Sequence, residues 1–459
     1  MTSCRRAASY LLSWSRRQML RTLAFALPLA NTAAAAYSFD PLEHLAGIAP
    51  YFEPEDPPLD PKPPQGCNVT RAAYLIRHSA IYANDFDYEE YIEPFTDELE
   101  NTTVDWSKAG PLAFLATWTT PISDEELEDL TKIGERDAMN LGVDVSLRYP
   151  SLKKPNKVWT STAERTELSA QSFISGLSRS NETEVVSVQE SEAEGADSLT
   201  PYKGCPKYSS SYGSEQSSQY KEKYTKPIIE RFQALAPEFN FTADDIVGMQ
   251  QLCGYETVVR GSSPFCSSEV FSANDWLEFE YMNDIQYFYN AGYANSISGT
   301  LGFPWVNAST GLLLADEASQ DIYVSFTHRE LPPTVIVALG LFNNSAYSGT
   351  NNPNATMPLT TQNYGRVWRS SAILPFLSNI AIEKMSCDSY GYDAGEFYRV
   401  LVNQSPQQLQ GCDDGPGVSC SKANFAEWVD NRGQLFGSYT EECQPDYDNS
   451  TDVLTIYDQ

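Results

Sequence analysis

The chain has 459 residues, 41% of them hydrophobic and 12% aromatic, which suffices for one large domain or two interlocked ones. Its formal net charge of -30 argues against nucleic acid or an anionic membrane surface as a partner, because like charges repel. A highly anionic substrate is disfavoured as well, unless a local basic pocket overcomes the overall field.

Residues 1–36 predict a signal peptide. They hold five arginines and no acidic residue, then the short apolar stretch TLAFALPLA, then small residues that permit cleavage near Ala36. The apolar stretch is too short for a comfortable membrane span, although an uncleaved anchor is the alternative. Removing the leader would leave a net charge of -35, and we expect a secreted protein, extracellular or wall-associated, without further membrane contact.

The cysteines and glycosylation sequons agree with secretion. Besides Cys4 in the leader there are eight cysteines, which fits four disulfides of open connectivity, and no CxxC pair that would indicate a cysteine zinc site. Nine Asn-x-Ser/Thr sequons predict N-glycans. They are Asn68, Asn101, Asn181, Asn240, Asn307, Asn343, Asn354, Asn403 and Asn449.

The next segments predict an arm and the first part of an α/β domain. Residues 37–66 are rich in proline and read as an extended N-terminal arm, and residues 67–194 alternate strand and helix patterns. A buried strand ends at Arg77-His78, and helical spacing covers 123–143. The short strand NKVWT precedes a helix for which Ser161 and Glu164 form an apparent capping box.

A mostly helical insertion or cap is predicted over 195–317, where the segment ANDWLEFEYMNDIQYFYNAG has a long helical pattern. The α/β pattern returns over 318–459 with the strand IYVSFT. Pro332 and Pro333 suit the first turn of the next helix, and NIAIEKMSC and FYRVLVNQ predict two more strands. The tail is expected to be stapled by Cys412 and Cys420.

Two of the only three histidines, His78 and His328, follow strand-like runs; the third is His44. Ligands of open α/β sheets bind beyond the carboxyl ends of the strands, so we expect both to face one cleft. Arg77 can grip phosphate oxygens and a neutral imidazole can attack phosphorus. From spacing alone a purely structural role for each histidine stays open, and a metal site with Glu330 lacks any supporting spacing such as HxxxH.

Several motifs resemble those of the histidine acid phosphatases, the phytase-like branch of the histidine phosphatase superfamily. LIRHSAIYA resembles the RHGxRxP motif, VWTSTAERTELSAQSFISGL the VRASGSDRV stretch, and SFTHRE the HD or HAE motif. The resemblance covers most of 67–459 and implies a phosphoglycerate-mutase-like three-layer α/β domain with a helical second domain. It further implies a phosphohistidine intermediate, no metal and no cofactor.

The same resemblance implies roles for single residues. His78 would be the nucleophile, Arg77 a phosphate clamp, His328 the second pocket histidine and Glu330 the acid. It also implies the disulfides Cys67–Cys387, Cys205–Cys443, Cys253–Cys266 and Cys412–Cys420.

The chain departs from the family pattern at two arginine positions, which hold Ile81 and Trp159. We expect both to line a cleft that is narrower and less basic than a phytase pocket, with phytate a weak substrate. Arg165 and Arg329 are the residues that would compensate as substrate contacts, although a surface charge and a salt bridge are their ordinary alternatives.

Three functions therefore remain, the first being a secreted phosphomonoesterase acting on a small phosphate ester. The second is the same fold diverted to acid–base chemistry on a small non-phosphate molecule, for example in secondary metabolism. The third is a non-catalytic pseudo-phosphatase glycoprotein. The sequence does not indicate the oligomeric state.

Overall fold

The computed structural model describes residues 39–54, 57–178 and 182–459. The predicted signal peptide and the Asn181 sequon lie outside the described residues. Within the described part no helix is both long and apolar enough to cross a bilayer. The chain from Asp40 to Gln459 forms one compact unit.

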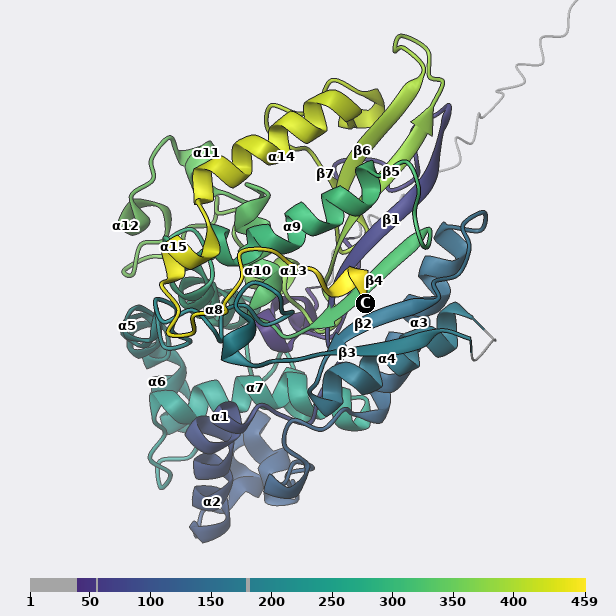
Figure 1. Ribbon diagram of the computed structural model, residues 1–459. Helices are drawn as coiled ribbons and strands as arrows, with labels where there is room; N and C mark the ends of the chain where they lie inside the picture. Colours follow the sequence, from purple (N-terminus) through teal and green to yellow (C-terminus); the bar gives the residue numbers. More distant parts are fainter. Residues whose placement is uncertain (1–38, 55–56, 179–181) are drawn as a thin grey trace, which may run out of the picture. The chain divides into compact units, whose positions relative to one another are not determined.

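A mixed eight-stranded sheet with the order β3-β2-β4-β1-β5-β6-β7, and with β8 pairing β6, forms the centre of this unit (Figure 1). β1 is hydrogen-bonded in parallel to β4 and in antiparallel to β5, and β2 and β3 continue the parallel half. The strands are β1 (Cys67–Arg77), β2 (Lys157–Ser161), β3 (Glu184–Val188), β4 (Ile322–Thr327), β5 (Asn379–Cys387), β6 (Gly395–Val402), β7 (Ser405–Gln407) and β8 (Cys420–Ser421).

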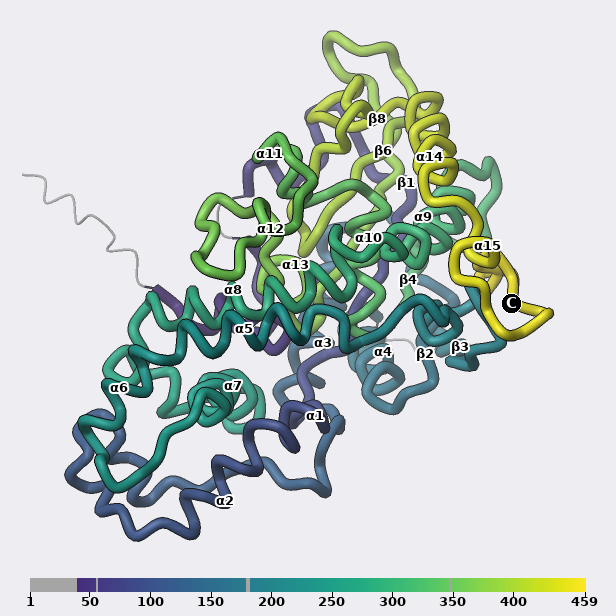
Figure 2. The backbone as a smooth tube through the Cα atoms, turned by 90° about the vertical axis from the view of Figure 1, so that its left-hand side faces the viewer, coloured from purple at the N-terminus to yellow at the C-terminus, as the bar shows by residue number. Residues whose placement is uncertain are grey.

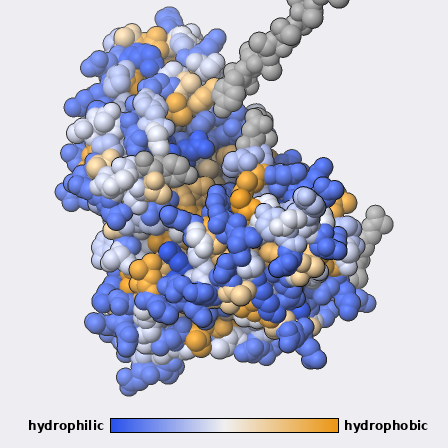
Figure 3. All heavy atoms as spheres, turned by 90° about the horizontal axis from the view of Figure 1, so that it is seen from above, coloured by the Kyte–Doolittle hydropathy of each residue, from blue (hydrophilic) through white to orange (hydrophobic). Residues whose placement is uncertain are grey.

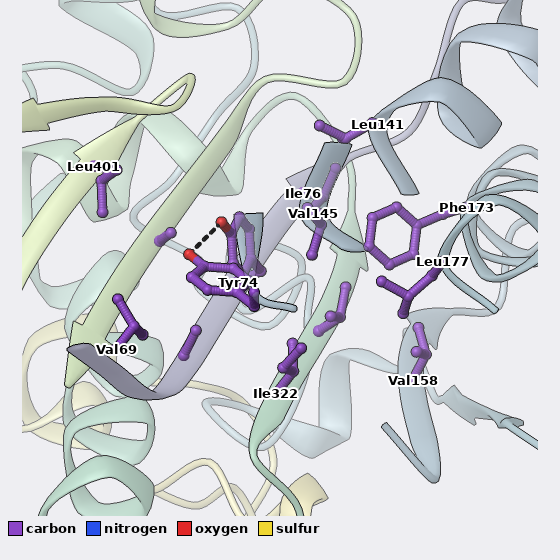
Figure 4. Packing of buried hydrophobic residues seen from close by; sticks show 14 of the residues in the cluster. Val69, Tyr74, Ile76, Leu141, Val145, Val158, Phe173, Leu177, Ile322 and Leu401 are labelled. Carbon is purple, nitrogen blue, oxygen red and sulfur yellow. Dashed lines mark hydrogen bonds between the residues drawn. The ribbon is translucent and has the colours of Figure 1, made fainter. Parts of the chain in front are cut away.

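Helices cover both faces of the sheet. α3 (Lys132–Arg148) and α4 (Glu164–Leu177) pack on one face, where their apolar side chains join those of β1, β4 and β5 in one buried cluster (Figure 4). α9 (Ser298–Leu314), α10 (Leu331–Ala338) and α14 (Lys422–Phe436) lie on the other face, against β1, β5 and β6 (Figure 1). This confirms the predicted three-layer α/β domain.

A helical part lies beyond one end of the sheet. It contains α5 (Ser214–Tyr224), α6 (Lys226–Leu235), α7 (Ala243–Arg260) and α8 (Ala273–Asn290). Two segments differ from the predicted boundaries: α2 (Glu93–Asn101) packs against α7 (Figure 2) although it falls in 67–194, and α9 packs on the sheet although it falls in 195–317. The remaining helices are short: α1 (Asp85–Asp87), α11 (Asn344–Ser348), α12 (Pro353–Thr356), α13 (Ser370–Ile373) and α15 (Tyr439–Cys443).

Two local predictions need correction, and one strand was not predicted. The helix predicted over 123–143 begins only at Lys132, because the Thr131 hydroxyl caps it by accepting from the Gly134 amide at 2.9 Å. The predicted capping box at Ser161 is wrong, since α4 is preceded by Ala163 and the Ser161 hydroxyl is bonded elsewhere. The strand β3 was not predicted, because its five residues are only partly buried and lack a long apolar run.

The four disulfides implied by the resemblance are present: Cys67–Cys387, Cys205–Cys443, Cys253–Cys266 and Cys412–Cys420. The prolines at 332 and 333 occupy the first turn of α10, as predicted. One sequon is incompatible with a glycan on the folded chain. Asn403 is 2% exposed, and its side chain accepts from the Asn379 amide and donates to the Ala372 carbonyl.

The predicted arm is partly built into the fold. Its 3-10 turn η2 (Ala46–Ile48) is buried, η1 (Pro41–His44) is buried at His44, and the Pro61 carbonyl accepts hydrogen bonds from Arg148 and Arg399. Because η2 runs directly beside the end of β1, the arm contributes to the surroundings of Arg77.

The face seen in Figure 3 is largely hydrophilic, with separate apolar patches.

Candidate active site

The strand ends bring the two predicted histidines together. Arg77 and Thr327 are partners in the parallel β1–β4 ladder, so the next residue of each strand, His78 and His328, leaves the sheet at the same edge. The two imidazole centroids lie 5.8 Å apart, with the rings at 66° to each other. The two histidines therefore lie close together at this edge of the sheet, and their sharing of one substrate site stays a prediction.

His78 is held in the state that a nucleophile requires. Its Nδ1 lies 2.8 Å from the Ser79 carbonyl oxygen, which can only accept, so Nδ1 carries the proton and Nε2 keeps its lone pair. Burial lowers the pKa of His78 well below its ordinary range, and the charges of Arg77 and Arg165 lower it further. His78 is therefore neutral in mildly acidic solution.

His328 is oriented by residues that sequence reasoning did not single out. Its Nε2 lies 3.1 Å from Glu190 Oε1 and 3.2 Å from the Ser161 hydroxyl. Lys203 Nζ holds the other Glu190 oxygen at 2.6 Å. Burial alone would raise the pKa of Glu190, but the hydrogen bonds and charges of His328 and Lys203 outweigh burial and hold the pKa below its usual range. Glu190 is therefore an ionised carboxylate, and it accepts a hydrogen bond from the N–H at His328 Nε2.

Arg77 is a fully buried guanidinium with spare donors. Its Nη1 donates to the carbonyls of Gly47 and Leu374, and the group stacks over the Phe376 ring at 4.7 Å. Its Nε and Nη2 are buried and have no protein partner. Burial lowers the pKa of Arg77 to about 10, so it stays charged at physiological pH.

Arg165 supplies a further spare donor. It lies in the first turn of α4, its Nη1 is paired with Glu128 Oε2 at 2.6 Å, and its Nε is buried without a partner. Its charge acts on His78, as the lowered pKa of that imidazole indicates. Arg77 and Arg165, whose charges both act on His78, together leave three buried guanidinium nitrogens without partners. Phosphate oxygens are acceptors that such donors bind.

Glu330 and Arg329 form an ion pair at the mouth of the site. Arg329 Nε donates to Glu330 Oε1 at 3.0 Å, and its guanidinium stacks over the Phe86 ring at 4.7 Å. Burial would raise the pKa of Glu330, but Arg329 and His328 outweigh burial and hold the pKa below its usual value. Glu330 is thus an ionised carboxylate in this structure.

Trp159 and Ile81 do not lie where we expected them. Trp159 is 1% exposed and packs against Tyr323 and Tyr457, with centroids 6.1 and 4.8 Å away. Side chains of a strand alternate between faces, so Trp159 points to the face opposite its neighbour Val158, which faces α4. Ile81 is fully buried and pairs its backbone with Leu130. Trp159 thus belongs to the protein core, and Ile81 lines neither of the two clefts described below.

Two clefts meet at Arg329, Glu330 and Ser210. One, of about 460 Å³, also touches Arg165 and His328. The other, of about 510 Å³, is lined by α1, the π-helical turn η3 (Tyr88–Ile92), the start of α5 and one side of α8. Among the described residues no group of three or more His, Cys, Asp or Glu side chains could hold a metal ion.

Chain order gave only weak signals for the residues that sequence reasoning missed. Glu190 lies 138 positions before His328, and nothing in its local pattern marks it. Asp87 was equally inconspicuous, yet it is buried and bonded to Asn84, Gln251 and Tyr255. The only available hint was position, because both follow shortly after segments that end at the active edge of the sheet.

The family model described as the histidine phosphatase superfamily (branch 2) matches residues 68–403. The chain belongs to this family. It is 29% identical over 397 residues to the acid phosphatase PHO1 of Komagataella pastoris, covering 83% of this chain and 81% of that one. It is 27% identical over 416 residues to a phytase of Candida albicans, covering 87% and 86%.

Solved structures agree with the family assignment. The crystal structure of the phytase from D. castellii superposes with a TM-score of 0.80 at 26% identity, covering 91% of this chain and 90% of that one. The multiple inositol polyphosphate phosphatase of Bifidobacterium longum shares the fold with a TM-score of 0.59 at 12% identity, covering 84% and 97%.

Proposed function

We propose that this histidine phosphatase is an extracellular acid phosphatase that hydrolyses small phosphate monoesters through a phosphohistidine on His78. One observation supports this most: three buried guanidinium nitrogens of Arg77 and Arg165 lack partners beside a neutral imidazole. Buried donors without partners are costly, and a bound phosphoryl group would satisfy all three.

In the first step His78 Nε2 attacks the phosphorus, and the bond from phosphorus to the alcohol oxygen breaks. The departing oxygen needs a proton, and Glu330 is the carboxyl group at the mouth of the site. A bound phosphate brings negative charge next to Glu330 and competes for Arg329. Both effects raise the pKa of Glu330, so the proton donor would form only once substrate is bound.

In the second step water attacks the phosphohistidine. The Glu330 carboxylate left by the first step takes a proton from this water, the phosphorus–nitrogen bond breaks, and inorganic phosphate leaves. Arg77 and Arg165 would hold the equatorial oxygens throughout, and His328 would lie beside the phosphoryl group while Glu190 fixes the orientation of its ring.

Secretion is a part of this proposal that rests on the leader-like residues 1–36, the remaining sequons and the four disulfides. Disulfides persist in oxidising compartments, and eight cysteines paired without remainder are typical of them. Finding the natural protein unglycosylated in cytosol with free thiols would contradict it.

The test of the catalytic role uses purified full-length protein and an aryl phosphate at acid pH. We expect turnover, and we expect His78→Ala to lose at least roughly a thousandfold in kcat. Wild-type protein is mixed briefly with a substrate whose phosphoryl group is labelled, and the reaction is stopped with alkali. Label should stay on the protein, since the phosphorus–nitrogen bond of phosphohistidine survives alkali. His44→Gln is the matched control, because this histidine contacts Glu280 at 3.4 Å outside the site and should not affect labelling.

The outcomes separate the remaining functions. Phosphate binding without turnover of any phosphate ester would favour acid–base chemistry on a non-phosphate molecule. Neither turnover nor phosphate binding would favour the non-catalytic glycoprotein.

A further inference from the structure

The larger cleft beside the proposed phosphate site determines which alcohol the enzyme would release. It has a volume of about 510 Å³ and meets the site at Arg329 and Glu330. A phosphate monoester that is seated on Arg77 and His78 and extends past Arg329 and Glu330 into this cleft would place its alcohol part against the lining of the cleft.

The lining is strongly biased toward negative charge. It contains four carboxylates, of Asp85, Asp87, Glu90 and Glu330, and one cation, Arg329. That cation is already bonded to Glu330 at 3.0 Å. The other polar groups are neutral, among them five serines and five side-chain amides. Such a surface repels a leaving group that carries further phosphates and attracts a cation.

An independent observation at the base of the cleft indicates the kind of cation. Gln251 lines the cleft, is 6% exposed, and has an Oε1 with no partner. Its Nε2 donates to Asp87 Oδ1 at 2.7 Å, and since the carboxylate can only accept, the orientation of the amide is settled. The cleft thus holds a buried acceptor that lacks an N–H or O–H donor.

We propose that this cleft selects phosphate monoesters of amino alcohols, with an ammonium group that carries N–H hydrogens. The ammonium would donate to Gln251 Oε1 and lie in the field of Asp85 and Glu90, and Asp87, whose pKa burial raises, would add its charge above that raised pKa. This inference rests on the proposed phosphatase function and adds the substrate class to it. A quaternary ammonium would gain from the charge and not from the amide, and inositol polyphosphates would be disfavoured.

The experiment compares matched substrates on full-length protein. Aminoalkyl phosphates of two, four and six carbons are paired with alkyl phosphates in which a methyl group replaces the ammonium. We expect kcat/KM to favour the amine at least roughly tenfold at the best chain length, and this preference to shrink with added salt. The trimethylammonium analogue of that length should fall between the two.

Variants tie the preference to this cleft. Asp85→Asn and Glu90→Gln should each reduce the amine-to-alkyl ratio roughly twofold to fivefold, as expected for exposed charge pairs. Gln251→Met should abolish the preference of primary over trimethylammonium. The matched control is Glu427→Gln on α14, which removes one exposed negative charge outside the cleft and should leave the ratio unchanged.

Two results would overturn the inference: equal kcat/KM for amine and alkyl substrates at every length, or an unchanged ratio in both carboxylate variants. Failure of the proposed function looks different, because then neither these esters nor an aryl phosphate would react and His78 would take no label. In that case calorimetric binding of the same matched pairs decides the inference, and equal affinities would reject it.

Discussion

The two ends of the proposed substrate site differ in charge and in exposure to solvent. The phosphate end has two arginines and two histidines and is closed off, with Arg77 and His78 at most 2% exposed. The cleft beyond it has exposed carboxylates at Asp85 and Glu90. Under the proposed function a chain of net charge -30 would hold phosphate because the local donors are desolvated and act at short range.

The difference shows which charges bind the phosphoryl group and which select among the alcohol parts of the substrates. Buried guanidinium nitrogens without partners act on any phosphoryl group, whatever the alcohol. Exposed carboxylates act more weakly and are screened by salt, but they distinguish one alcohol from another. Substitutions at the phosphate end should therefore affect all phosphate esters alike, whereas substitutions in the cleft should change only their ranking.

Arg77→Lys should lower kcat/KM roughly 10²- to 10³-fold for every phosphate ester, amine or not. A lysine ammonium has three donors on one nitrogen, so after bonding two backbone carbonyls it would offer the phosphate one N–H, where Arg77 offers two spare nitrogens in a fixed plane. Steady-state kinetics check this. Arg432→Lys is the matched control, since Arg432 also donates to two carbonyls, of Ala338 and Val337, outside the site. If the loss of kcat/KM in Arg77→Lys depended on the alcohol, the separation between phosphoryl binding and alcohol selectivity would be contradicted.

Trp159→Arg should destabilise the fold by several kcal/mol and not improve phosphate binding, because it buries a charge between Tyr323 and Tyr457. Trp159→Phe should cost less and leave kcat/KM near wild type. Denaturant unfolding and inorganic phosphate inhibition measure the two effects. A gain of phosphatase activity in Trp159→Arg would mean that position 159 contacts the phosphate after all.

Glu190→Gln should lower kcat/KM roughly tenfold to a hundredfold, the value of one hydrogen bond to a charged group. Glu190 is a positioning residue that holds His328, so the loss should appear with all substrates and change the pH profile of kcat/KM. Asp430→Asn, an exposed acid on α14, is the control. An unchanged pH profile with reduced thermal stability would reduce Glu190 to a structural role.

His78→Asn should gain stability relative to wild type as the pH falls. Burial holds the pKa of folded His78 well below its ordinary value, so below a pH of about 6.5 the unfolded chain binds a proton that the folded chain excludes. Wild type therefore loses stability at acid pH, and the variant escapes this loss, by at most about 2 kcal/mol at pH 5. Melting temperatures at pH 5 and pH 8 check this; a constant difference would contradict it.

Sequence patterns alone predicted an α/β layer and the sheet edge at which both histidines lie, whereas the three-layer fold with its helical second domain was implied by the family resemblance. Long buried runs predicted β1 and β4, and because parallel strands end at one edge, His78 and His328 had to meet. Family resemblance supplied the disulfide pairs. Local signals failed where the partner is distant in the chain, as at Ser161, whose hydroxyl bonds His328 instead of capping its helix.

Which residues the site contains became evident only in the folded chain. Because side chains alternate between the two faces of β2, Trp159 points away from α4 and packs in the core against Tyr457. Alignment to a motif does not reveal this direction. Segments far apart in the chain built the rest: Gly47 and Leu374 accept from Arg77, and Glu190 accepts from His328. The unpartnered nitrogens and the acidic cleft depend on which groups burial leaves without partners, and that is a property of packing rather than of sequence spacing.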